Sequence, residues 1–129
     1  MAPISVTLAR RDQPAAVVAL VGEHDTYSSA RLENELAVLL DDGQGIVVDL
    51  RDASFIDSTT LGVLLVAHQR AEQSSVGFAL VLPDRDYTEV HQILDLTGLG
   101  PIFTIFGTLD AALEAVRAGR TDQPPVRAA

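Results

Sequence analysis

The sequence predicts an α/β fold with a mixed, mostly parallel sheet of four to five strands and about four helices. After a first segment in which polar and apolar residues alternate, strand-like and helix-like segments take turns along the chain, an order typical of parallel strands joined by right-handed crossovers. The inner strand-like segments are nearly continuous apolar runs, as in strands covered on both faces. A length of 129 residues suits a single domain, which we expect over residues 1–118.

The expected strands fall at five places. Residues 4–10 alternate apolar and polar side chains, which predicts an edge strand, and the turn RRDQP separates it from the apolar run AAVVALVG at 15–22, a predicted central strand. Further short apolar runs predict strands at 45–50, 76–82 and 102–106. The intervening GEHD and RDASFID segments are interpreted as loops.

The expected helices carry apolar residues at helical spacing. The first is predicted to start at about Ser28 and to end where Gly43 supplies a left-handed residue, and the second runs from Ser58 to about Gln73. The third follows Pro83 and ends at LTGLG, and the fourth follows Thr108 as N-cap. Their predicted inward-facing residues are Leu32, Leu36, Leu39 and Leu40; Leu61, Leu64, Leu65 and His68; Val90, Ile93 and Leu94; and Leu109, Leu113 and Val116.

Composition excludes several function classes. The chain has no cysteine, so disulfides, thiolate catalysis and thiolate metal sites are excluded. Its net charge of -9 repels phosphate backbones and anionic lipid, so we expect no nucleic acid and no membrane as partner, whereas a basic protein surface fits better. No leader-like segment opens the chain and no apolar run is long enough to span a bilayer, so a cytoplasmic location is expected. The Pro-containing residues 119–129 are expected to form a frayed tail.

Little in the sequence favours catalysis or a cofactor. The histidines His24, His68 and His91 lie far apart without metal-ligand spacing, so we expect no metal site, with His24 as an exposed loop residue and His68 in or beside the core. Ser58 lacks the flanking glycines of a nucleophile elbow, and a chain without lysine has no P-loop. We therefore expect no enzyme and no cofactor.

Ser58 nevertheless stands at a chemically distinctive position, the start of the second helix. On spacing alone it is interpreted as the N-cap, but Asp57 beside it is a second capping residue, so one of the two is free for another task. A helix N-terminus tolerates phosphate because its free N–H groups and dipole favour negative charge. Phosphorylation of Ser58 adds about -1.5 to -2 charges beside Asp57, and near Glu23 and Asp25 if that loop lies alongside, which is enough to disrupt a closely packed interface.

Three segments then resemble one family: GEHD, IVVDLRDASFIDSTTLGVLLVAHQRA and LTGLGPIFTIFGTLDAAL. Together with the element order they are similar to the STAS domain family over residues 4–118, and within it to the stand-alone bacterial anti-sigma factor antagonists. The most specific part is Asp57-Ser58, which matches the D-S-(S/T)-G-L pattern of that family.

The resemblance implies a non-enzymatic switch in a partner-switching pathway of bacterial stress response. The unphosphorylated form is expected to bind an anti-sigma factor serine kinase, which supplies the ATP, and thereby to free a sigma factor for transcription. Phosphorylation at Ser58 releases the antagonist, and a serine phosphatase resets it. The partner-binding residues implied by the resemblance are Glu23, His24, Asp25, Asp57, Ser58, Thr59, Thr60 and Leu61.

The chain departs from the family pattern at two positions. Thr60 stands where glycine is common, so we expect a bulkier loop, and His24 stands where an aliphatic residue is usual. Two other functions stay open: a STAS scaffold or accessory subunit without phospho-switching, in which Ser58 is only a cap, and a small enzyme with Ser58 as nucleophile. Thr59 and Thr60 are predicted to complete the first helical turn.

Overall fold

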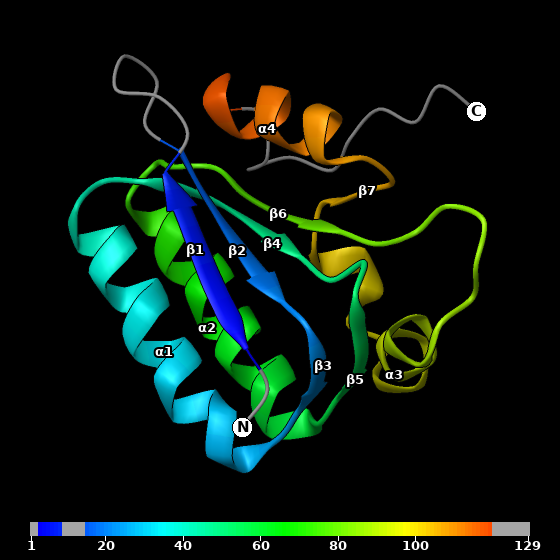
Figure 1. Ribbon diagram of the computed structural model, residues 1–129. Helices are drawn as coiled ribbons and strands as arrows, with labels where there is room; N and C mark the ends of the chain where they lie inside the picture. Colours follow the sequence, from blue (N-terminus) through cyan, green and yellow to red (C-terminus); the bar gives the residue numbers. More distant parts are fainter. Residues whose placement is uncertain (1–2, 9–14, 120–129) are drawn as a thin grey trace.

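The computed structural model describes residues 3–8 and 15–119, and its centre is a five-stranded sheet with the order β1-β2-β4-β6-β7 (Figure 1). Its strands are β1 (Ile4–Leu8), β2 (Ala15–Leu20), β4 (Gly45–Asp49), β6 (Phe78–Val81) and β7 (Ile105–Phe106). Strand β1 lies at the edge and pairs antiparallel with β2, and the other neighbours pair in parallel. The predicted mixed, mostly parallel sheet is confirmed.

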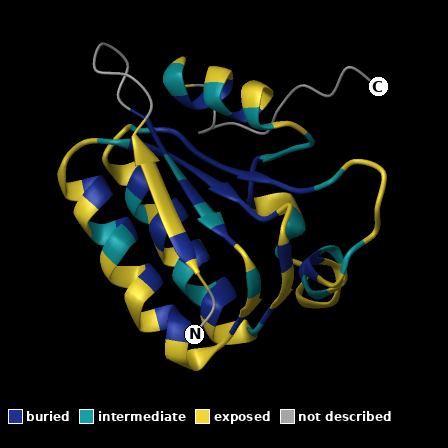
Figure 2. Ribbon diagram, in the orientation of Figure 1, coloured by how far each residue is buried: buried dark blue, intermediate teal, exposed yellow. Residues whose placement is uncertain are grey.

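Helices cover both faces of this sheet. They are α1 (Thr26–Asp41), α2 (Ser58–Gln73), α3 (Glu89–Thr97) and α4 (Leu109–Arg117). Helices α1 and α2 pack side by side on one face, whereas α4 lies on the other (Figure 1). Along β4, Ile46 and Val48 point into the main core toward α1 and α2, and Val47 points into the smaller core under α4. The predicted burial of the inner strands on both faces follows from this arrangement, which Figure 2 shows as dark blue along the central strands.

A second, two-stranded parallel sheet was not expected. It consists of β3 (Gly22–His24) and β5 (Ala53–Ile56), two segments that were predicted to be loops. The strand predicted over residues 15–22 is shorter than expected, because β2 ends at Leu20 and Gly22, with φ of 79°, turns the chain at the first residue of β3.

Other element boundaries differ from expectation for local reasons. The predicted strand at 102–106 is reduced to β7, because Gly100–Ile102 form a single 3₁₀ turn with Pro101 inside it. Helix α1 begins two residues before Ser28. Gly43 has φ of 74° and ends α1 as predicted, and Thr108 caps α4 through a hydrogen bond from the Ala111 N–H to its Oγ1. The whole of the predicted 10–14 turn and all but Gly119 of the predicted 119–129 tail lie outside the described residues.

His68 lies in the core, as predicted. Its side chain is buried, its ring meets Phe78 and Phe103 edge-on, and its Nε2 lies 2.9 Å from a Glu72 carboxylate oxygen. Among the four helices of the described chain, none is long and apolar enough to cross a membrane.

Candidate functional site

The two-stranded sheet brings the starts of α1 and α2 to the same end of the molecule. Strand β3 leads directly into α1, β5 leads into α2, and the strands run in parallel with Glu23 opposite Phe55 and His24 opposite Ile56. Parallel neighbours end at the same edge of a sheet, so both helix N-termini lie together, at the lower end of the view in Figure 1. The loop that contains Asp25 therefore does lie alongside Asp57 and Ser58.

A single backbone carbonyl ties the two strand ends together. The carbonyl oxygen of His24 accepts hydrogen bonds from the Asp57 N–H at 3.1 Å and from the Thr60 hydroxyl at 3.3 Å. The Asp57 side chain in turn accepts a bond from the Thr60 N–H at 2.8 Å, so Asp57 is the N-cap of α2. The interpretation of Ser58 as the N-cap is therefore wrong: Ser58 is the first helical residue.

Because Asp57 caps the helix, the Ser58 hydroxyl is free. Ser58 is exposed, and its side chain makes no hydrogen bond within the described part of the chain. Thr59 follows it on the surface within the same helical turn, as predicted. The first-turn N–H groups that Asp57 leaves unpaired add positive potential at this point. This arrangement can accept a phosphate without loss of the helix cap.

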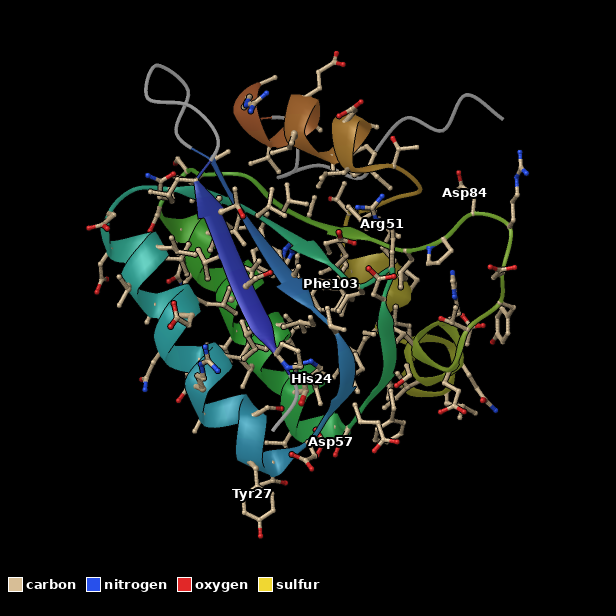
Figure 3. All side chains as sticks on the ribbon, viewed as in Figure 1. His24, Tyr27, Arg51, Asp57, Asp84 and Phe103 are labelled. Carbon is tan, nitrogen blue, oxygen red and sulfur yellow. The ribbon has the colours of Figure 1, made fainter. Side chains whose placement is uncertain are left out.

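Three of the predicted partner-binding side chains are buried. His24 and Thr60 are 0% exposed and Leu61 is 1% exposed, so none of them can contact a partner directly in this conformation. The expectation of an exposed loop histidine fails because β3 places His24 on its inner side, opposite Ile56. The expectation that Thr60 makes the loop bulkier also fails, since its side chain points inward to the His24 carbonyl. Figure 3 shows His24 inside the fold and Asp57 near its lower edge.

The buried His24 imidazole has a hydrogen-bond partner for only one of its two ring nitrogens in the described structure. Its Nε2 lies 3.0 Å from the Val21 carbonyl oxygen, whereas its Nδ1 is buried without a hydrogen-bond partner among the residues that the structure describes. Burial lowers the pKa of His24 below its usual 6.5 and outweighs the bond to Val21 and the nearby charge of Asp25, both of which raise the pKa. The ring is therefore neutral at pH 7.

Asp25 has a structural task that the sequence did not reveal. It is the N-cap of α1: its Oδ1 accepts a bond from the Tyr27 N–H at 3.0 Å, and its own N–H donates to Ser28 Oγ at 3.1 Å. This cap explains why α1 starts two residues earlier than predicted. Asp25 is exposed as well, so it can still face a partner.

Sequence reasoning missed two aromatic residues at this end of the molecule. Tyr27, in the first turn of α1, is 83% exposed, and Phe55, in β5, is 39% exposed. In Figure 3 the Tyr27 side chain points away from the body of the protein. The signal that could have found Tyr27 was an aromatic residue placed two positions after a possible cap and outside the apolar stripe of its helix.

The charge at this end is uncompensated. Glu23, Asp25 and Asp57 take part in none of the ion pairs among the described residues, which are Arg51 with Asp49, Arg70 with Asp41 and His68 with Glu72. In residues 3–8 and 15–119, no group of three histidines or carboxylates is placed to hold a metal ion. The site is thus an acidic, partly aromatic surface around one free hydroxyl.

Comparison with known proteins gives a consistent result. The STAS domain family model matches residues 7–112. The anti-sigma-F factor antagonist RsfB of Mycobacterium tuberculosis is 33% identical over 124 residues, which cover 95% of this chain and 98% of that protein. The anti-sigma-B factor antagonist of Listeria monocytogenes is 30% identical over 104 residues, covering 79% and 88%. A crystal structure of an anti-sigma factor antagonist from Mycobacterium paratuberculosis superposes with a TM-score of 0.73 at 28% identity, covering 89% and 95%. The chain belongs to the STAS domain family.

Proposed function

We propose that this protein is an anti-sigma factor antagonist that works by partner switching. Its unphosphorylated form binds an anti-sigma factor serine kinase and frees a sigma factor, and phosphorylation at Ser58 ends the complex. Relatives at 30–33% identity that cover most of the chain carry the name of anti-sigma factor antagonists, which supports the general role. The serine kinase, the phosphoserine and a serine phosphatase that resets the cycle are finer parts of the proposal.

The observation that supports the proposed switch is that Asp57 and Ser58 have different roles at the start of α2. Asp57 supplies the helix cap, so the Ser58 hydroxyl is exposed and unbonded in the described structure and is available to accept a phosphoryl group. Thr60 is a poor competing acceptor because its side chain is buried. Thr59 is exposed and is the alternative that site mapping has to exclude.

Phosphate at Ser58 changes the surface more than it changes the fold. It adds about -1.5 to -2 charges at a helix N-terminus, where the dipole and free N–H groups favour an anion. Asp57 beside it is already a carboxylate, so the local surface becomes strongly negative. For transfer to occur, the γ-phosphate of the kinase-bound ATP has to lie opposite the Ser58 hydroxyl. After transfer, the phosphate on Ser58 and the phosphates of the bound nucleotide face each other across a desolvated contact, and both are anionic. Each loss of about 1.4 kcal/mol in binding free energy through this repulsion weakens binding tenfold.

In this scheme the protein is a substrate and a ligand, with the partner as the enzyme. The kinase supplies ATP and the cations that neutralise it. The antagonist presents one hydroxyl on a rigid helix start, held by the Asp57 cap and the His24 carbonyl. No cofactor of its own is required.

The test combines binding and phosphorylation with the anti-sigma factor kinases of the same organism. We expect Ser58→Asp to lose binding while its far-UV circular dichroism and melting temperature stay close to those of the wild type, since aspartate tolerates the first turn of a helix. Gln69→Glu, an exposed change on the same helix, adds charge elsewhere and should leave binding intact. Ser58→Ala should bind but take up no phosphate.

Mass spectrometry after incubation with kinase and ATP identifies the acceptor. We expect one added phosphate at Ser58, retained in Thr59→Ala and absent in Ser58→Ala. Unchanged binding of Ser58→Asp, or phosphate at Thr59 alone, contradicts the proposed switch and favours a scaffold role for the domain.

A further inference from the structure

A pocket of about 470 Å³ opens beside the ends of β6 and β7, and none of its described lining residues belongs to the surface around Ser58. Its walls come from the segment after β6, one side of α3, the 3₁₀ turn and the end of β7. Because β6 and β7 are parallel, both reach this edge with their carboxyl ends, outside which open α/β sheets commonly bind ligands. The volume suits a small molecule, since such sites measure about 300–1,000 Å³.

Asp84 holds a carboxylate against one wall of this pocket. It lies on the segment between β6 and α3 (Figure 3), and its carboxylate packs on Gly107, in the space that a Cβ at this glycine would fill. A larger residue in place of Gly107 therefore has to displace the carboxylate. Within the described part of the chain the Asp84 side chain makes no hydrogen bond and no ion pair, so its oxygens are available to a ligand.

Asp95 supplies a second carboxylate, on the wall that α3 forms. Its Oδ2 accepts a hydrogen bond from the Tyr87 hydroxyl, and the Tyr87 ring stacks on His91 with 5.5 Å between the ring centroids. The His91 Nδ1 in turn accepts a bond from the Thr88 N–H at 3.0 Å, which orients the ring. These contacts form without a ligand, so this wall is held in place before anything binds and little ordering is required on binding.

The lining restricts the charge of a ligand. Its described residues include two carboxylates and no arginine or lysine, so anions such as nucleotides are repelled. A ligand that covers Asp84 and Asp95 has to supply positive charge, because removing unpaired carboxylates from water is costly. The apolar residues of the lining favour a hydrocarbon body; they are Leu82, Pro83, Leu94, Pro101, Ile105 and Phe106.

We propose that this pocket binds a small organic cation, whose ammonium or guanidinium group pairs with the carboxylates of Asp84 and Asp95 and whose apolar body packs on the remaining wall. The occupant is a free small molecule rather than a side chain of a partner protein, because a pocket of this volume can hold a whole ligand. The inference goes beyond the proposed function and does not involve Ser58.

The test compares three compounds with the same six-carbon chain: hexylamine, hexanol and hexanoate. Each is titrated into the full-length protein at pH 7, where an alkylamine is protonated because its pKa lies near about 10.4. We expect the amine to bind at least about tenfold more tightly than the alcohol, and the acid not to bind. Backbone amide NMR shifts should change around Asp84, Leu94 and Gly107, which line the pocket.

Substitutions in the pocket identify the groups that recognise the cation. Asp84→Asn and Asp95→Asn should each weaken amine binding by about tenfold and leave alcohol binding unchanged. Gly107→Ala should also weaken amine binding, because the added Cβ displaces the Asp84 carboxylate, and the melting temperature should change little because that side chain is exposed and can move. Glu33→Gln removes one exposed carboxylate on α1, outside the pocket, and is the matched control.

Four outcomes would overturn the inference. An amine that binds no more tightly than the alcohol shows that the pocket does not recognise positive charge. An equal loss of amine binding in Glu33→Gln shows general attraction to an acidic protein, and shift changes centred elsewhere show a different site. If an acetylated tripeptide with one central lysine binds more tightly than hexylamine, the occupant is a partner's side chain rather than a small molecule.

Discussion

Asp57 and Ser58 are adjacent side chains that can both cap a helix, and the structure gives the cap to Asp57 alone. We therefore expect Asp57→Ala to lower the free energy of unfolding by about 1 kcal/mol, the usual cost of a lost N-cap. Ser58→Ala should change it by less than about 0.5 kcal/mol, as for an exposed side chain without partners. Urea unfolding followed by circular dichroism compares the two, and an equal cost for both variants would contradict the assignment of the cap.

His24 makes stability depend on pH. Its folded-state pKa lies below 6.5 because the ring is buried, so the unfolded chain binds a proton more readily than the native one. The stabilising contribution is complete above the unfolded pKa, falls as pH drops below about 6.5 and levels off once the pH passes the folded pKa. We expect wild-type stability to decline from pH 7 to pH 5 more steeply than that of His24→Leu.

The measurement for His24 is a pair of chemical denaturation series over this pH range. The difference between wild type and variant removes the titration of carboxylates that the two proteins share, including Asp25, whose charge acts on the pKa of His24. Parallel stability curves would show that His24 is not the titrating group.

At the scale of elements, Thr60 joins the start of α2 to the end of β3. Its hydroxyl donates to the His24 carbonyl at 3.3 Å from a fully buried position. Thr60→Val keeps the shape but removes this donor, so we expect a loss of about 1 kcal/mol. Thr60→Gly should cost more, because it also removes buried methyl contact and places glycine in the first turn. Thermal and urea unfolding rank the variants, and a Thr60→Val protein as stable as wild type would show that the hydroxyl adds nothing to stability.

The elements differ in how far the sequence could predict them. Helix α2 and strand β4 were predictable because their apolar patterns are long or unbroken. Strands β3 and β5 have only three and four residues, too few for an alternating pattern to show which side chains face inward. The burial of His24 could therefore not be predicted from the sequence. They pair with each other across a separation of roughly thirty residues along the chain, which is a tertiary property.

Some features of the candidate site could likewise be predicted from the sequence, and others could not. The motif around Ser58 was readable, and Glu23, Asp25 and Thr59 are on the surface as predicted. Which of Asp57 and Ser58 caps α2 depends on backbone geometry that residue types do not determine. The position of Tyr27 outside the apolar stripe of α1 is consistent with exposure, but its 83% exposed side chain is a property of the folded structure.

At the scale of the whole molecule, charge is distributed in a way that favours one direction of approach. The chain carries 18 acidic residues against 9 basic ones. Arg51 and Arg70 are paired with Asp49 and Asp41, whereas Glu23, Asp25 and Asp57 have no such partner among the described residues. The field of the molecule and the local field of these three carboxylates therefore have the same sign, and both attract a basic partner surface over a distance of about one Debye length.

This agreement between local and overall charge predicts how association responds to salt. Raising ionic strength from about 0.05 M to about 0.5 M screens long-range attraction, so the association rate with the anti-sigma factor kinase should fall by about tenfold or more. The dissociation rate should change much less, because it depends on short-range contacts that salt screens only weakly. Stopped-flow mixing over a salt series measures both rates, with Glu23→Gln expected to show a shallower slope. An association rate that is independent of salt would contradict this prediction, because Glu23, Asp25 and Asp57 would then have no part in guiding the encounter.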